Sequence, residues 1–252
     1  MRPTLWPAAA FAALALTALP VRAEDALPKL GPDAVPLTAD HAYLAAAPAP
    51  DYWAFAPFVK PQFTSSACGV ASVTAAVNGL AGLPALAEET VMSQPEMLDL
   101  IGSDAWAAIS AEGGDGVKFA QLVDFATQAM TARGIAGRVE TFHPAEAGAE
   151  PTPEMGAKLR EILAANEASA DDVALIYFNQ GVVTGDWDGP HVSLIGAYDA
   201  GADRVLILEV DQDWYIPYWT PVDVALAAML KPTSAEHGVL EGETGGIVRL
   251  IR

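Results

Sequence analysis

The order of two periodicities along the chain constrains the fold most. Residues 67–80 carry apolar side chains at three- and four-residue steps, the period of an amphipathic helix. Runs rich in β-branched residues dominate after residue 170 instead. The predicted helices span 67–80, 95–101, 119–134, 152–165 and 221–230, and the predicted strands span 138–142, 173–178, 191–198, 205–211 and 247–251. Helices that largely precede strands are typical of an α+β fold with an antiparallel sheet, not of a wound parallel sheet.

The charge balance excludes several classes of partner. The 252 residues include 32 Asp and Glu against 13 Lys and Arg, which gives a formal net charge of −19. Such an excess repels phosphate, so nucleic acids and anionic membrane surfaces are not expected partners. The chain is 52% hydrophobic and only 18% charged, so it can bury a substantial core.

The N-terminus has the pattern of a secretory signal peptide over residues 1–23. Arg2 supplies the positive start, residues 8–19 an apolar run, and Val21-Arg22-Ala23 a small-residue cleavage site. We therefore expect a secreted, periplasmic protein with no membrane attachment after cleavage. Residues 24–50 are rich in Pro and Ala and are predicted to be an irregular lead-in, followed by one domain over 51–252.

The chain has one cysteine, Cys68. A single cysteine excludes an intramolecular disulfide framework and a cysteine-cluster zinc site within the chain. By residue type alone it would be a small buried hydrophobe. However, Cys68 opens the helix predicted at 67–80, where free backbone N–H groups and the helix dipole favour a thiolate. Ser65 or Ser66 is expected to cap that helix.

A thiolate nucleophile needs a base, and the base needs an orienting group. Three of the four histidines lie in loop-like segments: His41, His143 and His237. His191 instead begins an apolar strand. If 191–198 pairs with 205–211 across the turn at 199–204, His191 lies opposite residues 209–212. Glu209 and Asp211 then point to the same face, so the period of the strand does not choose between them.

Gln62 lies six residues before Cys68, in a stretch that contains Pro61. Its side-chain amide and the backbone N–H of Cys68 could together bind an oxyanion. Taken alone, Gln62 is better explained as an exposed loop amide.

Several segments together resemble the phytochelatin synthase family. The stretch QFTSSACGVAS at 62–72, followed by VNGL at 77–80, resembles that family's nucleophile helix. GPHVSLIGAY at 189–198 is similar to its Gly-His-Phe-Ser-Pro strand. LILEV at 206–210 and YIPYW at 215–219 resemble its Leu-Ile-Leu-Asp-Val and Tyr-Pro-Pro-aromatic-Trp segments. DGVKF at 115–119 and the closing GIVRLIR also have counterparts, so the resemblance runs from about residue 55 to 252.

The resemblance implies a papain-like fold, in which a helical part carrying the nucleophile packs on an antiparallel sheet. By that match Cys68 is the nucleophile, His191 the general base and acid, and Gln62 an oxyanion donor. The orienting position falls on Glu209, where the family has Asp, and Asp211 remains a rival because Glu is longer by one carbon–carbon bond of about 1.5 Å.

The family reaction is acyl transfer on glutathione. Glycine leaves, and a γ-glutamylcysteinyl thioester forms on the enzyme and passes to a second glutathione or to water. Short bacterial members resemble hydrolases, so hydrolysis is expected to exceed chain extension here. The resemblance implies a small thiol peptide as partner, no required cofactor, cadmium or zinc as activators or within the substrate thiolate, and a homodimer.

The expected substrate side departs from the family pattern. Gln180 and Gln212 fall where the family commonly has arginines that would pair with the carboxylates of glutathione, and an amide cannot replace that bidentate pairing. We therefore expect weaker binding of glutathione and a shift towards another γ-glutamyl compound or small peptide, with Gln180, Gln212 and Tyr218 against the substrate.

Two alternatives stay open. One is a general cysteine peptidase or amidase, and the other is a catalytically inactive domain that binds thiol peptides or metal. No spacing of His, Cys, Asp and Glu in the sequence forms a dedicated metal site.

Overall fold

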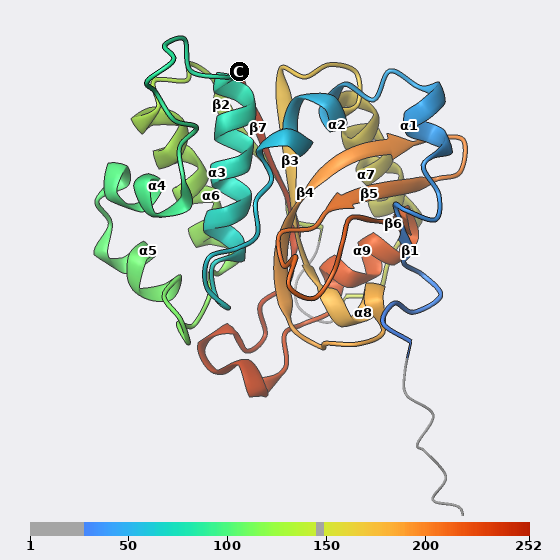
Figure 1. Ribbon diagram of the computed structural model, residues 1–252. Helices are drawn as coiled ribbons and strands as arrows, with labels where there is room; N and C mark the ends of the chain where they lie inside the picture. The colour runs from blue at the N-terminus through green and yellow to red at the C-terminus, as the bar shows by residue number, and fades with distance from the viewer. Residues whose placement is uncertain (1–27, 145–148) are drawn as a thin grey trace, which may run out of the picture.

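A seven-stranded sheet runs through the computed structural model, which describes residues 28–144 and 149–252 (Figure 1). The strand order is β1-β6-β5-β4-β3-β7-β2, and every neighbouring pair is antiparallel. The strands are β1 Val35–Pro36, β2 Arg138–Phe142, β3 Asp172–Asn179, β4 Pro190–Asp199, β5 Arg204–Leu208, β6 Tyr218–Pro221 and β7 Gly246–Ile251. The architecture is therefore α+β with an antiparallel sheet, as the sequence predicts.

Helices cover both faces of this sheet (Figure 1). One face packs against α2 Pro50–Phe55, α3 Cys68–Ala81 and α6 Phe119–Ala132, with α4 Gln94–Ile101 and α5 Asp104–Ile109 outside them. The opposite face packs against α7 Pro153–Asn166, α8 Gln180–Thr184 and α9 Val222–Leu230. The remaining short helices are α1 Ala42–Ala46, η1 Ala56–Phe58 and η2 Ala235–Leu240.

Strand β3 shows why the predicted strands are uniformly apolar rather than alternating. All its residues are buried, because successive side chains enter opposite layers. Leu175 and Tyr177 belong to the core on the α3 side, whereas Ile176 and Phe178 belong to the core beneath α9. A strand covered on both faces favours a continuous apolar run, and in β3 this run is 173–178, between Asp172 and Asn179 at its ends.

The hairpin of β4 and β5 has the register that the sequence predicts. Leu194 pairs with Leu208 and Tyr198 with Val205, across the turn at 199–204. The register shifts at Gly196, where an added Cβ would lie only 2.5 Å from Leu208 Cγ. Strand β5 ends at Leu208, so the prediction of a strand to residue 211 is wrong, and Glu209 lies just beyond the ladder.

The structure differs from the sequence prediction in the lead-in. Residues 24–50 were expected to be irregular, but β1 pairs with β6 at Val35–Trp219 and α1 follows it. Short elements such as β1 and α1 have too few residues to show a period, which explains why the sequence pattern does not predict them. The predicted signal peptide lies outside the described residues. No helix of the described part is long and apolar enough to cross a membrane.

Candidate active site

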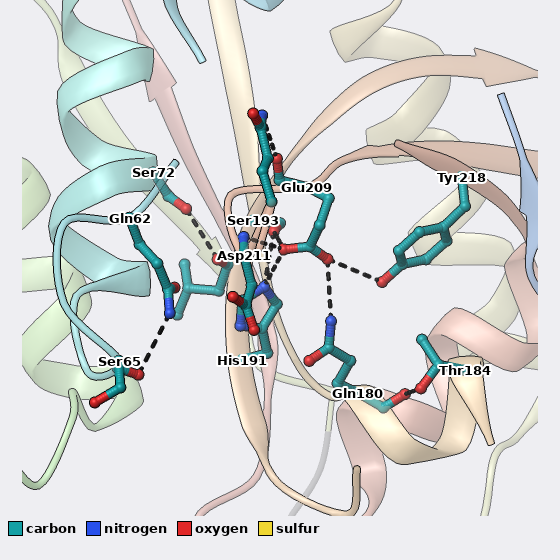
Figure 2. Close-up of polar contacts among 12 residues, drawn as sticks. Gln62, Ser65, Ser72, Gln180, Thr184, His191, Ser193, Glu209, Asp211 and Tyr218 are labelled. Carbon is teal, nitrogen blue, oxygen red and sulfur yellow. Dashed lines mark hydrogen bonds and ion pairs between the residues drawn. The ribbon is translucent and has the colours of Figure 1, made fainter. Parts of the chain in front are cut away.

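The candidate residues meet at one edge of the sheet, where α3 and β4 begin and β5 ends. The antiparallel hairpin brings His191, near the start of β4, beside the segment that follows β5 (Figure 2). Cys68 is the first residue of α3, which packs directly on β4. The fold thus places a thiol, an imidazole and a carboxylate from three separate segments at the same edge.

The start of α3 carries no side-chain cap. Ala67 occupies the N-cap position, so the predicted cap by Ser65 or Ser66 is wrong. The two serines bond elsewhere: the Ser65 hydroxyl donates to Glu112 at 2.6 Å, and the Ser66 hydroxyl donates to the carbonyl of Gly114 at 2.7 Å. Backbone N–H groups of the first turn, beside the partly exposed Cys68, therefore remain for a ligand.

Ser72 ties the nucleophile helix to the histidine strand. Its buried hydroxyl donates to the carbonyl of Val192 at 2.9 Å (Figure 2). Ser72 lies one helical turn after Cys68, and Val192 follows His191 directly. The bond therefore holds the first turns of α3 against the start of β4, and so fixes the distance between the Cys68 thiol and the His191 imidazole.

His191 and Glu209 form a buried pair. His191 Nε2 lies 2.6 Å from Glu209 Oε1, and the Ser193 hydroxyl donates to that same oxygen at 3.3 Å (Figure 2). Since Nε2 is engaged, Nδ1 is the nitrogen left for Cys68. Burial lowers the pKa of His191, but the Glu209 charge and hydrogen bonds to Cys68 and Glu209 outweigh it and raise that pKa to about 10.

Glu209 keeps its charge because donors surround it. The Asp211 backbone N–H donates to Oε1 at 2.7 Å, while the Gln180 amide and the Tyr218 hydroxyl donate to Oε2 at 3.0 and 3.3 Å. Burial raises the pKa of Glu209, but the His191 charge, the hydrogen bond with His191 and the backbone N–H groups of Asp211 and Val210 outweigh it, so the pKa is lowered overall. The ionised carboxylate holds the imidazole in one orientation.

Gln62 reaches the same edge from the loop before α3. Its backbone N–H donates to the carbonyl of Val210 at 2.8 Å, which fastens this loop beside Glu209. Its side-chain nitrogen donates to the carbonyl of Ser65 at a long 3.4 Å, and Oε1 is buried with no partner among the described residues. The amide faces the cavity beside Cys68, so a small rotation of it would offer Nε2 to a ligand.

The cavity in front of these residues has a volume of about 660 Å³. Cys68, His191 and Gln62 lie on its wall, together with aromatic and acidic side chains. Its other lining residues are Phe63, Thr64, Ser65, Glu112, Gln180, Asp186, Trp187, Asp211, Asp213, Trp214 and Tyr215.

A family model of phytochelatin synthase matches residues 40–237. The chain belongs to the phytochelatin synthase family. This is a family of acyltransferases and peptidases whose general reaction is γ-glutamylcysteinyl transfer from glutathione. A search of curated proteins finds no match to the chain.

The resemblance assigns the family's orienting carboxylate to Glu209. In the structure the Glu209 carboxylate, and not the side chain of Asp211, contacts the His191 imidazole. Asp211 offers its backbone N–H to the pair, and its carboxylate lines the cavity.

Gln180 and Gln212, which were expected at the positions of the family's arginines, lie in different surroundings. Gln180 touches the cavity, but its amide nitrogen binds Glu209. The side chain of Gln212 donates to the carbonyl of Glu209 at 3.0 Å, and it is not among the described lining residues. Tyr218 is fully buried behind Glu209, so the expectation that it contacts substrate is wrong. Gln180 and Tyr218 hold the carboxylate, and only Gln180 also reaches the cavity.

Sequence reasoning did not find Ser72, Ser193 or the tryptophans of the cavity wall as parts of the site. A serine within an apolar helix or strand, such as Ser72 or Ser193, is a weak signal that it bonds across the core. For a metal, the described residues contain no group of three or more His, Cys, Asp or Glu side chains placed to hold an ion.

Proposed function

We propose that the chain is a papain-like cysteine acyltransferase or hydrolase that cleaves an amide of γ-glutamylcysteine through a thioester on Cys68. The observation that carries the proposal is the buried 2.6 Å contact of His191 with Glu209, placed so that the other imidazole nitrogen is left for Cys68. This is the arrangement of nucleophile, base and orienting group that covalent acyl transfer requires.

In the first step the proton shared by Cys68 and His191 lies on the imidazole, whose raised pKa favours it there, and the Cys68 sulfur attacks the amide carbonyl as the thiolate. Glu209 stabilises this imidazolium, because its charge lies 2.6 Å from Nε2. The tetrahedral intermediate carries its negative charge on oxygen. The backbone N–H of Cys68 and the amide of Gln62 are the two donors proposed for that oxygen.

In the second step the carbon–nitrogen bond breaks, the imidazolium gives its proton to the leaving amine, and a γ-glutamylcysteinyl thioester remains on Cys68. Water or a second thiol peptide then attacks the thioester while His191 takes the incoming proton. Sulfur leaves as the thiolate, and the proton taken from the acceptor stays on His191, which restores the starting pair. We propose that water is the usual acceptor, so hydrolysis exceeds chain extension.

The setting of the reaction is also a proposal. The signal-like pattern of residues 1–23 supports export to the periplasm, where a small thiol peptide would be the partner. Cadmium or zinc would enter as a thiolate complex of that peptide and so belong to the substrate. No resident cofactor is needed for the steps above.

Intact-protein mass spectrometry after incubation with γ-glutamylcysteine p-nitroanilide tests the proposal. The leaving group of this compound is uncharged, so the result does not depend on how the cavity binds a charged amine. A γ-glutamylcysteinyl adduct is expected on the wild type and on no residue of Cys68→Ala. Alkylation by iodoacetamide provides the second measurement. Cys68 should react at pH 6, where an ordinary thiol with a pKa of about 8.5 is almost wholly protonated. His191→Ala should slow that reaction.

If no adduct forms and His191→Ala leaves the alkylation rate unchanged, the protein is the inactive binding domain instead. If unrelated peptide anilides are cleaved as fast as the γ-glutamylcysteine compound, it is a general peptidase.

A further inference from the structure

The wall of the active-site cavity is acidic on both sides of the cleft. Glu112 comes from the loop between α5 and α6, whereas Asp186, Asp211 and Asp213 come from loops at the edge of the sheet. Apart from His191, whose charge is paired with Glu209, the described lining residues include no basic side chain. A ligand therefore meets negative charge whichever end of it lies near Cys68.

Asp186 is paired with Lys29, but the other three carboxylates have no ion-pair partner among the described residues. Glu112 accepts two hydrogen bonds from Ser65, at 3.0 and 2.6 Å, and they lower the pKa of the carboxyl, which keeps it ionised. The side chains of Asp211 and Asp213 have no hydrogen-bond or ion-pair partner among the described residues. Asp211 is half-buried beside His191; burial raises the pKa of its carboxyl, and the His191 charge offsets this only in part.

The same wall already holds one ammonium group of the chain itself. Lys29 Nζ lies 4.6 Å from the centre of the Trp214 ring and 4.5 Å from that of Tyr215. It also lies 3.7 Å from a carboxylate oxygen of Asp186. Carboxylates and aromatic faces together are the surroundings that bind ammonium and guanidinium groups. Lys29 balances one of the four acids, and Trp187 adds a further aromatic side chain that is 44% exposed.

Two uncharged polar atoms of the cavity wall are acceptors without a donor. Gln180 is fully buried and lines the cavity, yet its Oε1 has no hydrogen-bond partner among the described residues. Gln62 Oε1 is likewise buried without a partner there. A buried acceptor without a donor costs free energy that an N–H group of a ligand would recover. The carboxylate of a glycine leaving group offers acceptors only.

We propose that the substrate of this cysteine centre is an amide whose amine part carries a positive charge, such as a diamine joined to γ-glutamylcysteine, rather than the anionic tripeptide with glycine. This inference rests on the proposed function and specifies its leaving group. The acids and tryptophans would hold the ammonium of the amine part while Cys68 attacks the amide carbonyl. The carbon–nitrogen bond breaks, and the free diamine leaves with the proton from His191.

Three matched γ-glutamylcysteine amides test the charge alone: those of glycine, glycinamide and 1,3-diaminopropane. We measure kcat/KM for release of each amine by the whole protein at low salt. The cationic amide should exceed the neutral one about threefold and the glycine amide about tenfold or more, since each favourable surface contact of charge is worth up to about 1 kcal/mol. Raising the ionic strength should reduce both ratios.

Asp213→Asn should lower the ratio of the cationic to the neutral rate about two- to threefold, because one exposed charge is lost. Asp99→Asn, an equally exposed change on α4, is the control and should leave that ratio unchanged. Equal rates for the three amides, or a preference for the glycine amide, would overturn the inference.

The uncharged p-nitroanilide separates this outcome from failure of the proposed function. If Cys68 is acylated by the anilide but the charged amides show no preference for the cation, the proposed reaction stands and the inference is wrong. If the anilide does not acylate Cys68, the proposed function itself fails, and the inference fails with it.

Discussion

Two carboxylates in this protein have no solvent exposure, yet their surroundings favour opposite charge states. Glu209 lies in the candidate site and Asp51 lies at the start of α2, and both side chains are 0% exposed. The pKa of Glu209 is lowered, whereas burial raises the pKa of Asp51 to about 9. At neutral pH one is ionised and the other is protonated.

The number of donors explains the difference. Glu209 accepts from the imidazole of His191, from the Asp211 backbone N–H and from the side chains behind it. Asp51 accepts from the amide of Asn166 on one oxygen, and its other oxygen has no partner among the described residues. The neighbouring Glu167 further raises the pKa of Asp51.

The comparison shows that burial alone does not set the charge of a carboxylate; the neighbouring charges and the hydrogen-bond donors around it do. At Asp51 a proton replaces the missing donors, and the side chain is part of the packing. At Glu209 the donors keep a full negative charge beside an imidazole. Only the second arrangement can stabilise an imidazolium during a reaction.

Paired amide substitutions should separate the two carboxylates most sharply. Glu209→Gln should lower kcat/KM for the p-nitroanilide by about 10³- to 10⁴-fold, because the imidazolium loses its counter-charge and the imidazole its fixed tautomer. Asp51→Asn replaces a neutral acid by a neutral amide and should change kcat/KM by less than about twofold. Circular dichroism should show both variants folded. A Glu209→Gln variant that keeps a tenth of the wild-type rate would contradict the role given to this residue.

The sequence predicts the parts of this comparison unevenly. Residues 67–80 and the paired strands of His191 have strong periods, so their helix, hairpin and register are predicted well. Glu209 directly follows the five residues of β5, and it faces His191 once the turn at 199–204 sets the register of the hairpin. The choice between Glu209 and Asp211 depends on side-chain reach, which an alternating pattern does not contain.

Other features depend on contacts between distant segments. Asp51 is next to Asn166 only because α2 and α7 pack against the same sheet, and no local pattern connects them. Tyr218 resembles a pocket residue in the sequence, whereas the fold places it behind Glu209. The acidic wall combines loops that lie about 100 residues apart, so only the average charge of the chain hinted at it.

Shortening the site carboxylate should have a smaller effect than removing its charge. In Glu209→Asp the carboxylate would sit about 1.5 Å further back, so it could not reach both His191 and the Gln180–Tyr218 pair. We expect kcat/KM to fall about 10- to 100-fold, the range for a misplacement near 1 Å. Steady-state rates with the p-nitroanilide measure this. An unchanged rate would mean that the protein accommodates the family's usual residue without loss.

Asp51 should instead control how stability depends on pH. Its pKa is about 9 in the folded protein and about 3.9 in an unfolded chain, so the folded state holds the extra proton between those values. The free energy of unfolding therefore falls as pH rises through this window, by at most about 1.4 kcal/mol per unit. Asp51→Asn removes that contribution and should be more stable than wild type at pH 8, by up to about 5 kcal/mol, with little difference at pH 4.

Urea denaturation at pH 4, 6 and 8 measures this difference. The His191–Glu209 pair changes both proteins equally: Glu209 loses its contribution in acid, and His191 loses its own as pH rises from about 6.5 towards 10. The two effects cancel in the comparison. Identical pH profiles for wild type and Asp51→Asn would show that Asp51 is already ionised at neutral pH.

The smallest predicted effect comes from single hydroxyl groups in the two regions. Tyr218→Phe removes the 3.3 Å bond to Glu209, and Tyr43→Phe removes the 3.0 Å bond to Glu167 near Asp51. Each bond is worth about 1 kcal/mol, so both variants should lose similar stability.

Only Tyr218→Phe should also lower kcat, by about three- to tenfold, because Glu209 then holds His191 less firmly. Its acidic limb in the pH–rate profile should move to higher pH, because Glu209 would bind a proton more readily with one donor fewer. If Tyr43→Phe lowered kcat as much, both changes would be acting through general loss of stability.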